Sequence, residues 1–311
     1  MAFNIGIDVG GTNIRFGVFS GYTLVEEIRV EANLSLLCSQ LSAEHAGFEI
    51  VRLLSSQLIA LIEQYDEIQS VGIGFPGFIH PFTKKIVQSP NLPGLSYFDL
   101  GGELSAILGL PVLLENDAVV AAYGEYCLLK SSTKSADKES LIYIGLGTGV
   151  GGGLINTGQL FLGHHGVAME IGHMIVEQNG RECGCGNKGC MEQYASATGV
   201  AKSYFQATQK QHTAHEIAQM ALAGDKIAKQ AYELAARVLA QTLANIIKVV
   251  DVKNVVIGGG LIGAWPLMQK TFKQRFEADL IPVLRGDIKV KVSTAEDRAG
   301  MLGAALLNIK K

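Results

Sequence analysis

The chain has 311 residues, of which 48% are hydrophobic and 18% charged, with a formal net charge of −3. At roughly 100–200 residues per domain, this length predicts two domains, each able to bury a core. The small negative charge excludes a global attraction to nucleic acid or anionic membranes, and neither an apolar run of about eighteen residues nor a signal-peptide pattern is present, so we expect a cytoplasmic protein.

The first part of the chain alternates between strand and helix patterns. Residues 3–30 predict strands separated by turns, and apolar positions near a 3.6-residue period predict a helix over 46–65. The sequence SVGIGFPG predicts a buried strand, whereas 82–96 holds several prolines and is expected to be a loop. PVLLEND predicts another short strand, and DAVVAAYGEYCLLK after it predicts a helix.

The second part begins after 131–139, the most linker-like stretch of the chain. Its opening, YIGLGTGVGGGLI, has the same order of apolar strand, glycine turn and apolar strand as GIDVGGTNIRFGVF near the N-terminus. Either a structural repeat, with two similar domains facing each other across a cleft, or chance explains this likeness. Further on, the pattern predicts a long helix over Asp225–Val250, a strand at NVVIGGG and a last helix from about Asp297.

The first glycine-rich turn follows a strand that ends at Asp8. Glycine tolerates positive φ, and without a Cβ it lets backbone N–H groups approach an anion closely. Thr12 can add a hydroxyl donor, and Arg15 on the returning strand can aim a cation at phosphate. The alternative is an ordinary β-hairpin turn.

Two later glycine turns are further candidates for phosphate binding. Gly147-Thr148-Gly149 follows one strand, and Gly258-Gly259-Gly260 follows another and precedes a predicted helix, where nucleotides often dock. Neither is a Walker-type loop. Each turn alone is a weak signal, but three turns that all follow strands favour a phosphate-bearing ligand.

An acidic motif, Glu115-Asn116-Asp117, ends a predicted strand just before a helix. Asp117 can simply cap that helix. It can also be a general base at the carboxyl end of a strand, accepting the proton of a hydroxyl group that attacks a γ-phosphate. The residues alone do not separate these two roles.

Three further polar residues, Glu170, His173 and Glu192, lie near glycine turns. Two carboxylates and an imidazole could bind vicinal sugar hydroxyls and distinguish epimers, because an inverted hydroxyl leaves a buried acceptor unpaired. Surface polar residues in loops are the alternative.

The cysteines are concentrated in one cluster, Cys183, Cys185 and Cys190, spaced by glycines. Thiolates prefer a metal such as Zn²⁺, and His173 ten residues earlier completes a Cys₃His set typical of structural zinc sites. A disulfide with one free thiol, or three inert thiols, are the alternatives. In a reducing compartment this tight spacing favours zinc.

A series of short motifs follows in order along the chain. They are Asp8-x-Gly10-Gly11-Thr12 with Arg15, Gly74-Phe75-Pro76-Gly77, Glu115-Asn116-Asp117-Ala118, Gly145-x-Gly147-Thr148-Gly149-x-Gly151-Gly152-Gly153, Glu170-Ile171-Gly172-His173, the cysteine cluster with Glu192, and Ile257-Gly258-Gly259-Gly260. Nearly from end to end, this order resembles the ROK family of bacterial sugar kinases and repressors.

The resemblance implies two α/β domains of the actin-like, hexokinase-type ATPase fold with a cleft between them. We expect the first domain at 1–117, with a helix over about 297–311 packing back on it, and the second at 118–296. Implied cofactors are ATP and Mg²⁺ beside structural Zn²⁺, and a homodimer is the family's usual assembly. Asp117 matches the family's catalytic base. Implied sugar contacts are Asn91, Asn116, Glu170, His173 and Glu192. Implied nucleotide or Mg²⁺ contacts are Asp8, Gly10, Gly11, Thr12, Asn13, Arg15, Thr148, Gly149, Gly259 and Gly260.

Several functions remain open within this resemblance. The first is a kinase for the 6-hydroxyl of glucose, and the second is an N-acetylglucosamine or N-acetylmannosamine kinase; allose or fructose are further candidate substrates. Leu95 stands where family glucokinases often carry Trp, which leaves the sugar open. A sugar-responsive repressor is disfavoured, because the phosphate turn begins at Asp8 and the net charge is negative. A sugar-binding protein without catalysis is disfavoured by Asp117 and the phosphate turns.

Overall fold

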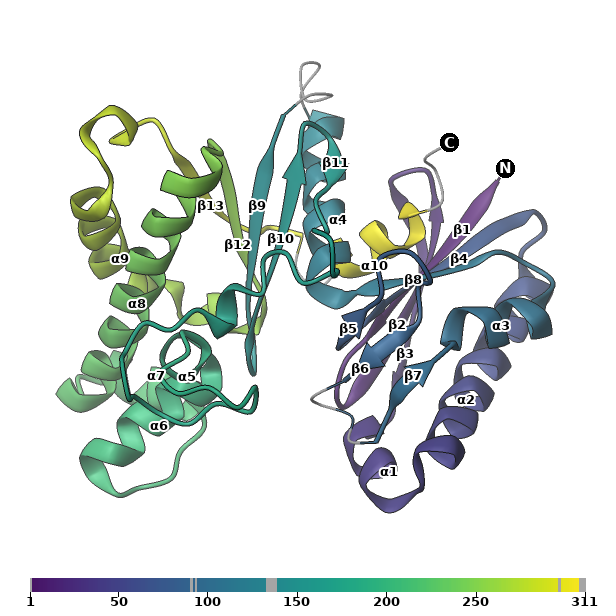
Figure 1. The fold of residues 1–311 in the computed structure, drawn as a ribbon, viewed down its shortest axis with the longest axis horizontal. Helices are drawn as coiled ribbons and strands as arrows, with labels where there is room; N and C mark the ends of the chain where they lie inside the picture. Colours follow the sequence, from purple (N-terminus) through teal and green to yellow (C-terminus); the bar gives the residue numbers. More distant parts are fainter. Residues whose placement is uncertain (1, 90–91, 93, 133–138, 296–297, 308–311) are drawn as a thin grey trace. The chain divides into compact units, whose positions relative to one another are not determined.

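The computed structural model describes residues 2–89, 92, 94–132, 139–295 and 298–307 (Figure 1). Asn91 and residues 133–138 of the predicted linker lie outside the described residues. The chain divides into two compact units. The first comprises Met1–Glu139, Gly153–Ala168 and Asp297–Lys311, and the second comprises Ser140–Gly152 and Met169–Glu296. This division falls later in the chain than the boundary expected after Asp117.

The first sheet has five strands in the order β3-β2-β1-β4-β8. They are β1 (Phe3–Val9), β2 (Asn13–Ser20), β3 (Thr23–Glu31), β4 (Ile68–Phe75) and β8 (Val112–Asn116). β1, β2 and β3 form an antiparallel meander, whereas β1, β4 and β8 run parallel. Their register sets Asp8 opposite Gly74 and Gly74 opposite Glu115. The carboxyl ends of three parallel strands therefore meet at one edge.

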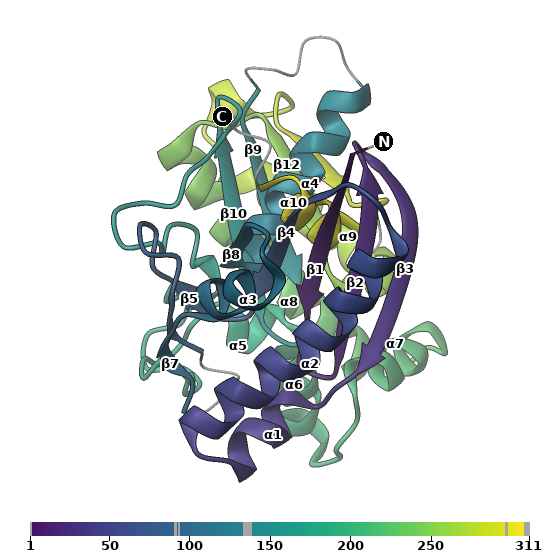
Figure 2. The same cartoon turned by 90° about the vertical axis from the view of Figure 1, so that its right-hand side faces the viewer.

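One face of this sheet is covered by α2 (Ala43–Gln64), which crosses in front of the strands in Figure 2. Its buried positions Ile50, Leu54 and Leu58 join alternate residues of the strands in one apolar core. The helix begins three residues before the predicted start, because Ser42 caps it by accepting a hydrogen bond from the His45 N–H. α1 (Leu34–Gln40) and α3 (Leu100–Leu108) flank it.

α2 is also the one described helix whose length and composition would allow it to cross a membrane. Its buried face belongs to the core of the first unit. Core helices of folded domains can have the same length and apolar composition as a helix that crosses a membrane.

The other face of the sheet carries α4 (Asp117–Ser132) and α10 (Arg298–Ala305), which lie side by side in Figures 1 and 2. α10 packs on β1, β4 and α4. This approach requires glycine, because a Cβ at Gly124 would collide with the Ala299 carbonyl and one at Gly303 with the Val120 carbonyl. The last helix thus returns to the first unit and fixes the helix that begins at Asp117.

A small antiparallel sheet also belongs to the first unit. It consists of β5 (Phe78–Ile79), β6 (Ile86–Gln88) and β7 (Ser96–Phe98). The expectation of a loop over 82–96 was therefore incomplete. Strands of two or three residues are too short to show an alternating pattern in the sequence.

The second sheet has the order β11-β10-β9-β12-β13. Its strands are β9 (Leu141–Leu146), β10 (Val150–Asn156), β11 (Gln159–Leu160), β12 (Asn254–Gly258) and β13 (Lys289–Val292). β9, β12 and β13 run parallel, as β1, β4 and β8 do. Three consecutive strands followed by two parallel ones thus occur twice in the same order, which confirms the predicted structural repeat.

The helices of the second unit are α5 (Glu192–Ala195), α6 (Ala197–Thr208), α7 (Ala214–Leu222), α8 (Lys226–Val250) and α9 (Trp265–Asp279). Three short 3₁₀ helices complete it: η2 (Ile171–His173), η3 (Gly260–Ala264) and η4 (Pro282–Leu284). α8 agrees with the predicted long helix, because the Asp225 side chain caps it by accepting hydrogen bonds from the N–H groups of Ile227 and Ala228.

Candidate functional site

Asp8 and Asp117 lie at the carboxyl edge of the parallel strands in the first unit. Asp8 is the next-to-last residue of β1 and pairs with Arg15 on β2, and its carboxylate faces Gly300 of α10. Burial, together with the negative charge of Asp117, raises the pKa of Asp8 to about 6, although Arg15 opposes the shift. Two residues 109 positions apart in the sequence are therefore electrostatic neighbours.

The first glycine turn joins β1 to β2 beside Asp8. The Gly10 N–H donates to the Asn13 carbonyl at 2.9 Å, and Asn13 Nδ2 donates to Thr12 Oγ1 at 3.1 Å. Neither glycine adopts a positive φ, so the conformational reason expected for them was wrong. Gly10 is needed because a Cβ would press on the Asn13 carbonyl, whereas the space around Gly11 is open to an approaching ligand.

The start of α4 is capped by Asn116 rather than by Asp117. Asn116 Oδ1 accepts hydrogen bonds from the N–H groups of Ala118 at 3.0 Å and Val119 at 3.1 Å. Asn116 Nδ2 donates to the Gly77 carbonyl at 3.0 Å. Asp117 lies in the first helical turn, where the helix dipole favours a carboxylate. Asp117 Oδ1 also accepts a hydrogen bond from the Ala118 N–H, at 2.8 Å, so its carboxylate takes part in the helix start although Asn116 is the cap.

The second glycine turn joins β9 to β10 in the second unit and is bound to Glu192. Glu192 Oε2 accepts a hydrogen bond from the Val150 N–H at 3.1 Å, and a Cβ at Gly149 would collide with the same carboxylate. The Thr148 carbonyl accepts a hydrogen bond from Thr198 Oγ1 at 2.8 Å. Glu192, a predicted sugar contact, therefore lies directly against the predicted phosphate turn at 147–149.

The third glycine turn follows β12. Gly259 has a φ of +85°, which disfavours residues with a Cβ, and a Cβ there would lie 2.5 Å from the Leu146 carbonyl at the end of β9. Gly260 has open space around it. The second and third glycine turns therefore lie next to each other in the second unit.

The four predicted metal ligands converge. Donor atoms of His173, Cys183, Cys185 and Cys190 all lie within 4.8 Å of one another. His173 Nδ1 is 3.6 Å from Cys183 Sγ, and the sulfurs of Cys185 and Cys190 are 3.6 Å apart. Tetrahedral zinc with bonds of about 2.0–2.3 Å requires ligand separations of roughly 3.5–3.8 Å. The set therefore fits zinc, and all three thiols are free rather than paired in a disulfide.

The thiols of the cluster differ in acidity. Burial and the neighbouring sulfurs of Cys183 and Cys185 raise the pKa of Cys190 to about 12, whereas hydrogen bonds, against the effect of burial, lower the pKa of Cys185. A thiol in the surroundings of Cys190 becomes a thiolate only when a cation lies beside it.

The imidazole of His173 connects the metal ligands to the predicted sugar contacts. With Nδ1 facing Cys183, the other ring nitrogen, Nε2, lies 3.8 Å from Glu170 Oε2. Burial raises the pKa of Glu170, against the lowering effect of His173. The metal ligands and Glu170 are thus neighbours in the second unit, and Glu192 begins α5 two residues after Cys190.

Arg181 is a structural residue that the sequence did not reveal. Its guanidinium donates to the carbonyls of Gln193 and Gly199 and to the side chains of Ser203 and Gln206, and it lies 4.5 Å from the ring centroid of Tyr194. These contacts attach the cysteine loop to α5 and α6. A single arginine before a cysteine pattern carries no sequence signal for this role.

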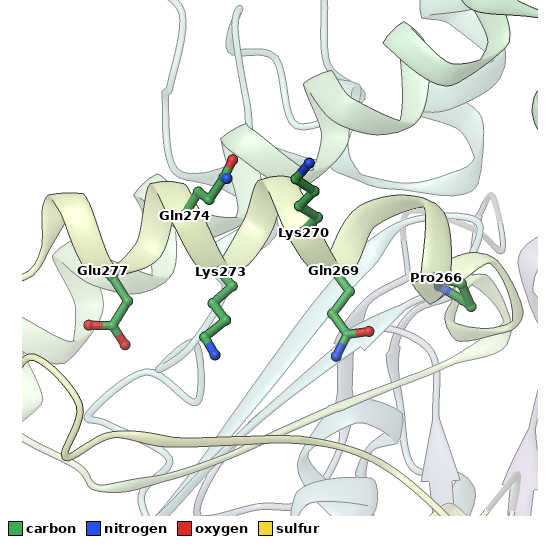
Figure 3. A pocket seen from close by; sticks show the side chains of 6 residues that line it. All are labelled: Pro266, Gln269, Lys270, Lys273, Gln274 and Glu277. Atoms are coloured by element: carbon green, nitrogen blue, oxygen red, sulfur yellow. The ribbon is translucent and has the colours of Figure 1, made fainter.

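A surface hollow of about 520 Å³ lies along α9 (Figure 3). It is lined by Pro266, Gln269, Lys270, Lys273, Gln274 and Glu277. Figure 3 shows Lys270 and Gln274 pointing to one side of the helix, and Gln269, Lys273 and Glu277 pointing to the other. These side chains do not converge on a common point, and the hollow contains none of the predicted site residues.

Comparisons with known proteins agree with these features. The ROK family model matches residues 4–311. Glucokinase from Halalkalibacterium halodurans is 31% identical over 323 residues, covering 97% of this chain and 94% of its own. N-acetylmannosamine kinase from Escherichia coli is 32% identical over 306 residues, covering 97% of each chain.

A solved structure of a ROK family glucokinase from Streptomyces griseus, in complex with glucose and AMPPNP, has a TM-score of 0.81 and 28% identity and covers 100% of both chains. This likeness confirms the expected fold class of two α/β domains of the actin-like ATPase type. With the family model matching nearly every residue, the chain belongs to the ROK family.

Proposed function

We propose that this chain is an ATP-dependent sugar kinase that phosphorylates the 6-hydroxyl of a hexose, with glucose as the first candidate substrate and Asp117 as the general base. The observation that carries the proposal is the pair of carboxylates, Asp8 and Asp117, at one edge of parallel strands beside a glycine turn. Kinases of this kind need one carboxylate near the nucleotide's metal ion and another at the acceptor hydroxyl.

The residues of the first unit have separate tasks in this mechanism. ATP, when bound, would supply the γ-phosphoryl group, and its Mg²⁺ would neutralise the charge on the phosphates. Asp8 would hold the magnesium, and Gly10, Gly11 and Thr12 would face the phosphates with their amides and hydroxyl. Asp117 would accept the proton of the sugar hydroxyl as the hydroxyl oxygen bonds to the γ-phosphorus and the bond from that phosphorus to ADP breaks. Asn13 and Arg15 are proposed as further contacts near the phosphates.

The residues of the second unit would bind sugar and nucleotide. Glu170, His173 and Glu192 are proposed to accept hydrogen bonds from, or donate them to, the sugar hydroxyls. The four ligands His173, Cys183, Cys185 and Cys190 fit a structural zinc ion that orients His173, since a ligated imidazole is fixed in both ring plane and tautomer. Thr148, Gly149, Gly259 and Gly260 are proposed to bind the nucleotide.

Two further sugar contacts, Asn91 and Asn116, are proposed in the first unit on different grounds. Asn91 lies outside the described residues, and its role rests on the family resemblance alone. Asn116 already caps α4 and bonds to Gly77, so at most its second amide hydrogen is left for a sugar. We propose that Asn116 chiefly orients the base.

The substrate is tested with a panel of glucose, mannose, fructose, allose, N-acetylglucosamine and N-acetylmannosamine, each with ATP in a coupled assay. The ratio of kcat/KM values ranks the sugars. We expect glucose to give the highest value. If no sugar in the panel supports ADP release above the rate without sugar, the proposed function is wrong.

An N-acetylhexosamine kinase is the second candidate, because the N-acetylmannosamine kinase relative is as similar to the chain as the glucokinase relative. A higher kcat/KM for N-acetylmannosamine than for glucose would select it. The homodimer and the cytoplasmic location are also proposals, which sedimentation analysis and cell fractionation can test.

A further inference from the structure

Glu115 is a buried carboxylate that the proposed mechanism does not use. Its side chain is 4% exposed, and it lies in β8 directly before Asn116 and Asp117. Lys84 Nζ lies 2.6 Å from Glu115 Oε2, and Glu115 Oε1 accepts a hydrogen bond from the Asn116 N–H at 3.1 Å. A buried charge without a partner is strongly unfavourable. Lys84 is therefore the cationic partner of this buried carboxylate.

Lys84 is held in place by its own loop. The loop joins β5 to β6, and Lys84 adopts a φ of +55°, which is uncommon for a residue other than glycine. Its N–H donates to the His80 carbonyl and the His80 N–H donates to the Lys85 carbonyl, both at 2.9 Å. His80 Nδ1 accepts hydrogen bonds from the N–H groups of Phe82 and Thr83. The loop thus maintains a strained backbone that directs the lysine to Glu115.

A second bond connects the same hairpin to the same strand end. Asn116 Nδ2 donates to the carbonyl of Gly77, the residue before β5. Asn116 Oδ1 in turn accepts from the N–H groups of Ala118 and Val119, on the far side of Asp117. The hairpin therefore contacts the strand end at two points. The Gly77 carbonyl binds the Asn116 side chain, and Lys84 binds the Glu115 carboxylate.

We propose that Lys84 and Glu115 form a positioning pair for the base. By neutralising Glu115, Lys84 keeps the end of β8 and the first turn of α4 in the arrangement that aims Asp117 at the sugar hydroxyl. The inference rests on the proposed function, because it assigns the pair a role through Asp117.

The two partners differ in how they tolerate loss of the other. The Lys84 side chain is 34% exposed and can be hydrated without Glu115, whereas Glu115 cannot be hydrated without moving. We therefore expect Lys84→Met to lower kcat by between about tenfold and about a hundredfold, the usual effect of misplacing a reacting group by about 1 Å. Glu115→Gln keeps an acceptor for the Asn116 N–H, and we expect it to lower kcat by less than about threefold.

The double variant, Lys84→Met with Glu115→Gln, separates positioning from general damage. It removes the unpaired buried charge, so we expect kcat to return to within about threefold of the Glu115→Gln value. The KM for ATP is expected to stay within about twofold in all variants, because the pair lies next to the base. If the folded double variant remains as slow as Lys84→Met, the role assigned to the pair is overturned.

Lys85→Met is the matched control. Lys85 is the next residue of the same loop and forms a surface ion pair with Asp99 at 3.3 Å, with both side chains more than 40% exposed. Such pairs contribute little, so its kinetics should equal those of the wild type. If Lys84→Met also equals the wild type, the inference is wrong while the proposed function stands. If neither the wild type nor Lys85→Met phosphorylates any hexose, the proposed function fails, and this inference fails with it.

Lys84→Gly keeps the test valid if Lys84→Met does not fold. Glycine accepts the positive φ without strain, so the loop itself is not weakened while the partner of Glu115 is lost. We expect Lys84→Gly to be less destabilised than Lys84→Met, because glycine relieves the positive φ although Glu115 still loses its partner, and to be as slow as predicted for Lys84→Met. Wild-type turnover by the folded Lys84→Gly variant overturns the inference.

Discussion

The pKa of Asp8 leads to a prediction that joins stability to function. In the folded chain this pKa is about 6, compared with the usual 3.8, and each pKa unit corresponds to about 1.4 kcal/mol. Keeping Asp8 charged therefore costs the folded state about 3 kcal/mol at neutral pH. The folded-state pKa is raised, so the native chain binds the extra proton between about pH 4 and pH 6. The penalty from Asp8 is accordingly absent below about pH 4, grows as the pH rises towards 6, and is constant above about pH 6.

The variant Asp8→Asn should remove both the cost and the pH dependence. We expect it to be more stable than the wild type by up to about 3 kcal/mol at pH 8, with the difference shrinking towards pH 4. The assay is urea unfolding of the two proteins at several pH values, in buffer without added magnesium or nucleotide, followed by circular dichroism. The same variant should have no measurable kinase activity, since Asp8 is proposed to hold the magnesium. If Asp8→Asn is no more stable than the wild type at pH 8, or if the difference does not change with pH, the burial and repulsion assigned to Asp8 are wrong.

Three further changes have expected outcomes. Asp117→Asn should keep the fold and sugar binding but lower kcat by about three decades or more; near-normal turnover in the coupled assay would remove Asp117 as base. Cys185→Ser should lower zinc content and raise the KM for the sugar by releasing His173; elemental analysis of protein purified without chelator measures this, and wild-type protein without zinc would contradict the site. Arg181→Met should lower the free energy of unfolding by about 3 kcal/mol, because the partly buried carbonyls of Gln193 and Gly199 lose their donor; an unchanged melting temperature would show that the cysteine loop does not depend on it.

Local features of this protein could be predicted from its sequence. The long helix α8 was predicted almost to its ends, because its apolar period lies within the helix and its capping residue, Asp225, lies directly before it. The three cysteines of the metal cluster lie within eight residues, so chain geometry alone brings them together. The repeat of strand, glycine turn and strand was also visible, although only the matching strand orders distinguished it from chance.

Other features depend on contacts that cannot be predicted from the sequence. The positive φ expected at Gly10 and Gly11 was wrong, because a close approach to the Asn13 carbonyl, and not backbone strain, explains the first glycine. The strands β5, β6 and β7 were missed, since pairings of so few residues depend on tertiary contacts. The cap of α4 belongs to Asn116, which the Glu115-Asn116-Asp117 motif alone could not distinguish from Asp117.

The sequence by itself therefore determined the fold class, the order of the motifs and the four residues whose donor atoms converge in the Cys₃His cluster, because each depends on short-range spacing or on family resemblance. Only the tertiary structure decided which charges meet. Asp8 and Asp117 become neighbours through the parallel register of β1, β4 and β8, and Lys84 reaches Glu115 through a hairpin 31 residues away. Such electrostatic pairs are set by how strands align and how loops return. For the same reason the Glu115-Asn116-Asp117 motif was recognisable in the sequence, whereas the charged groups that surround it became evident only in the folded chain.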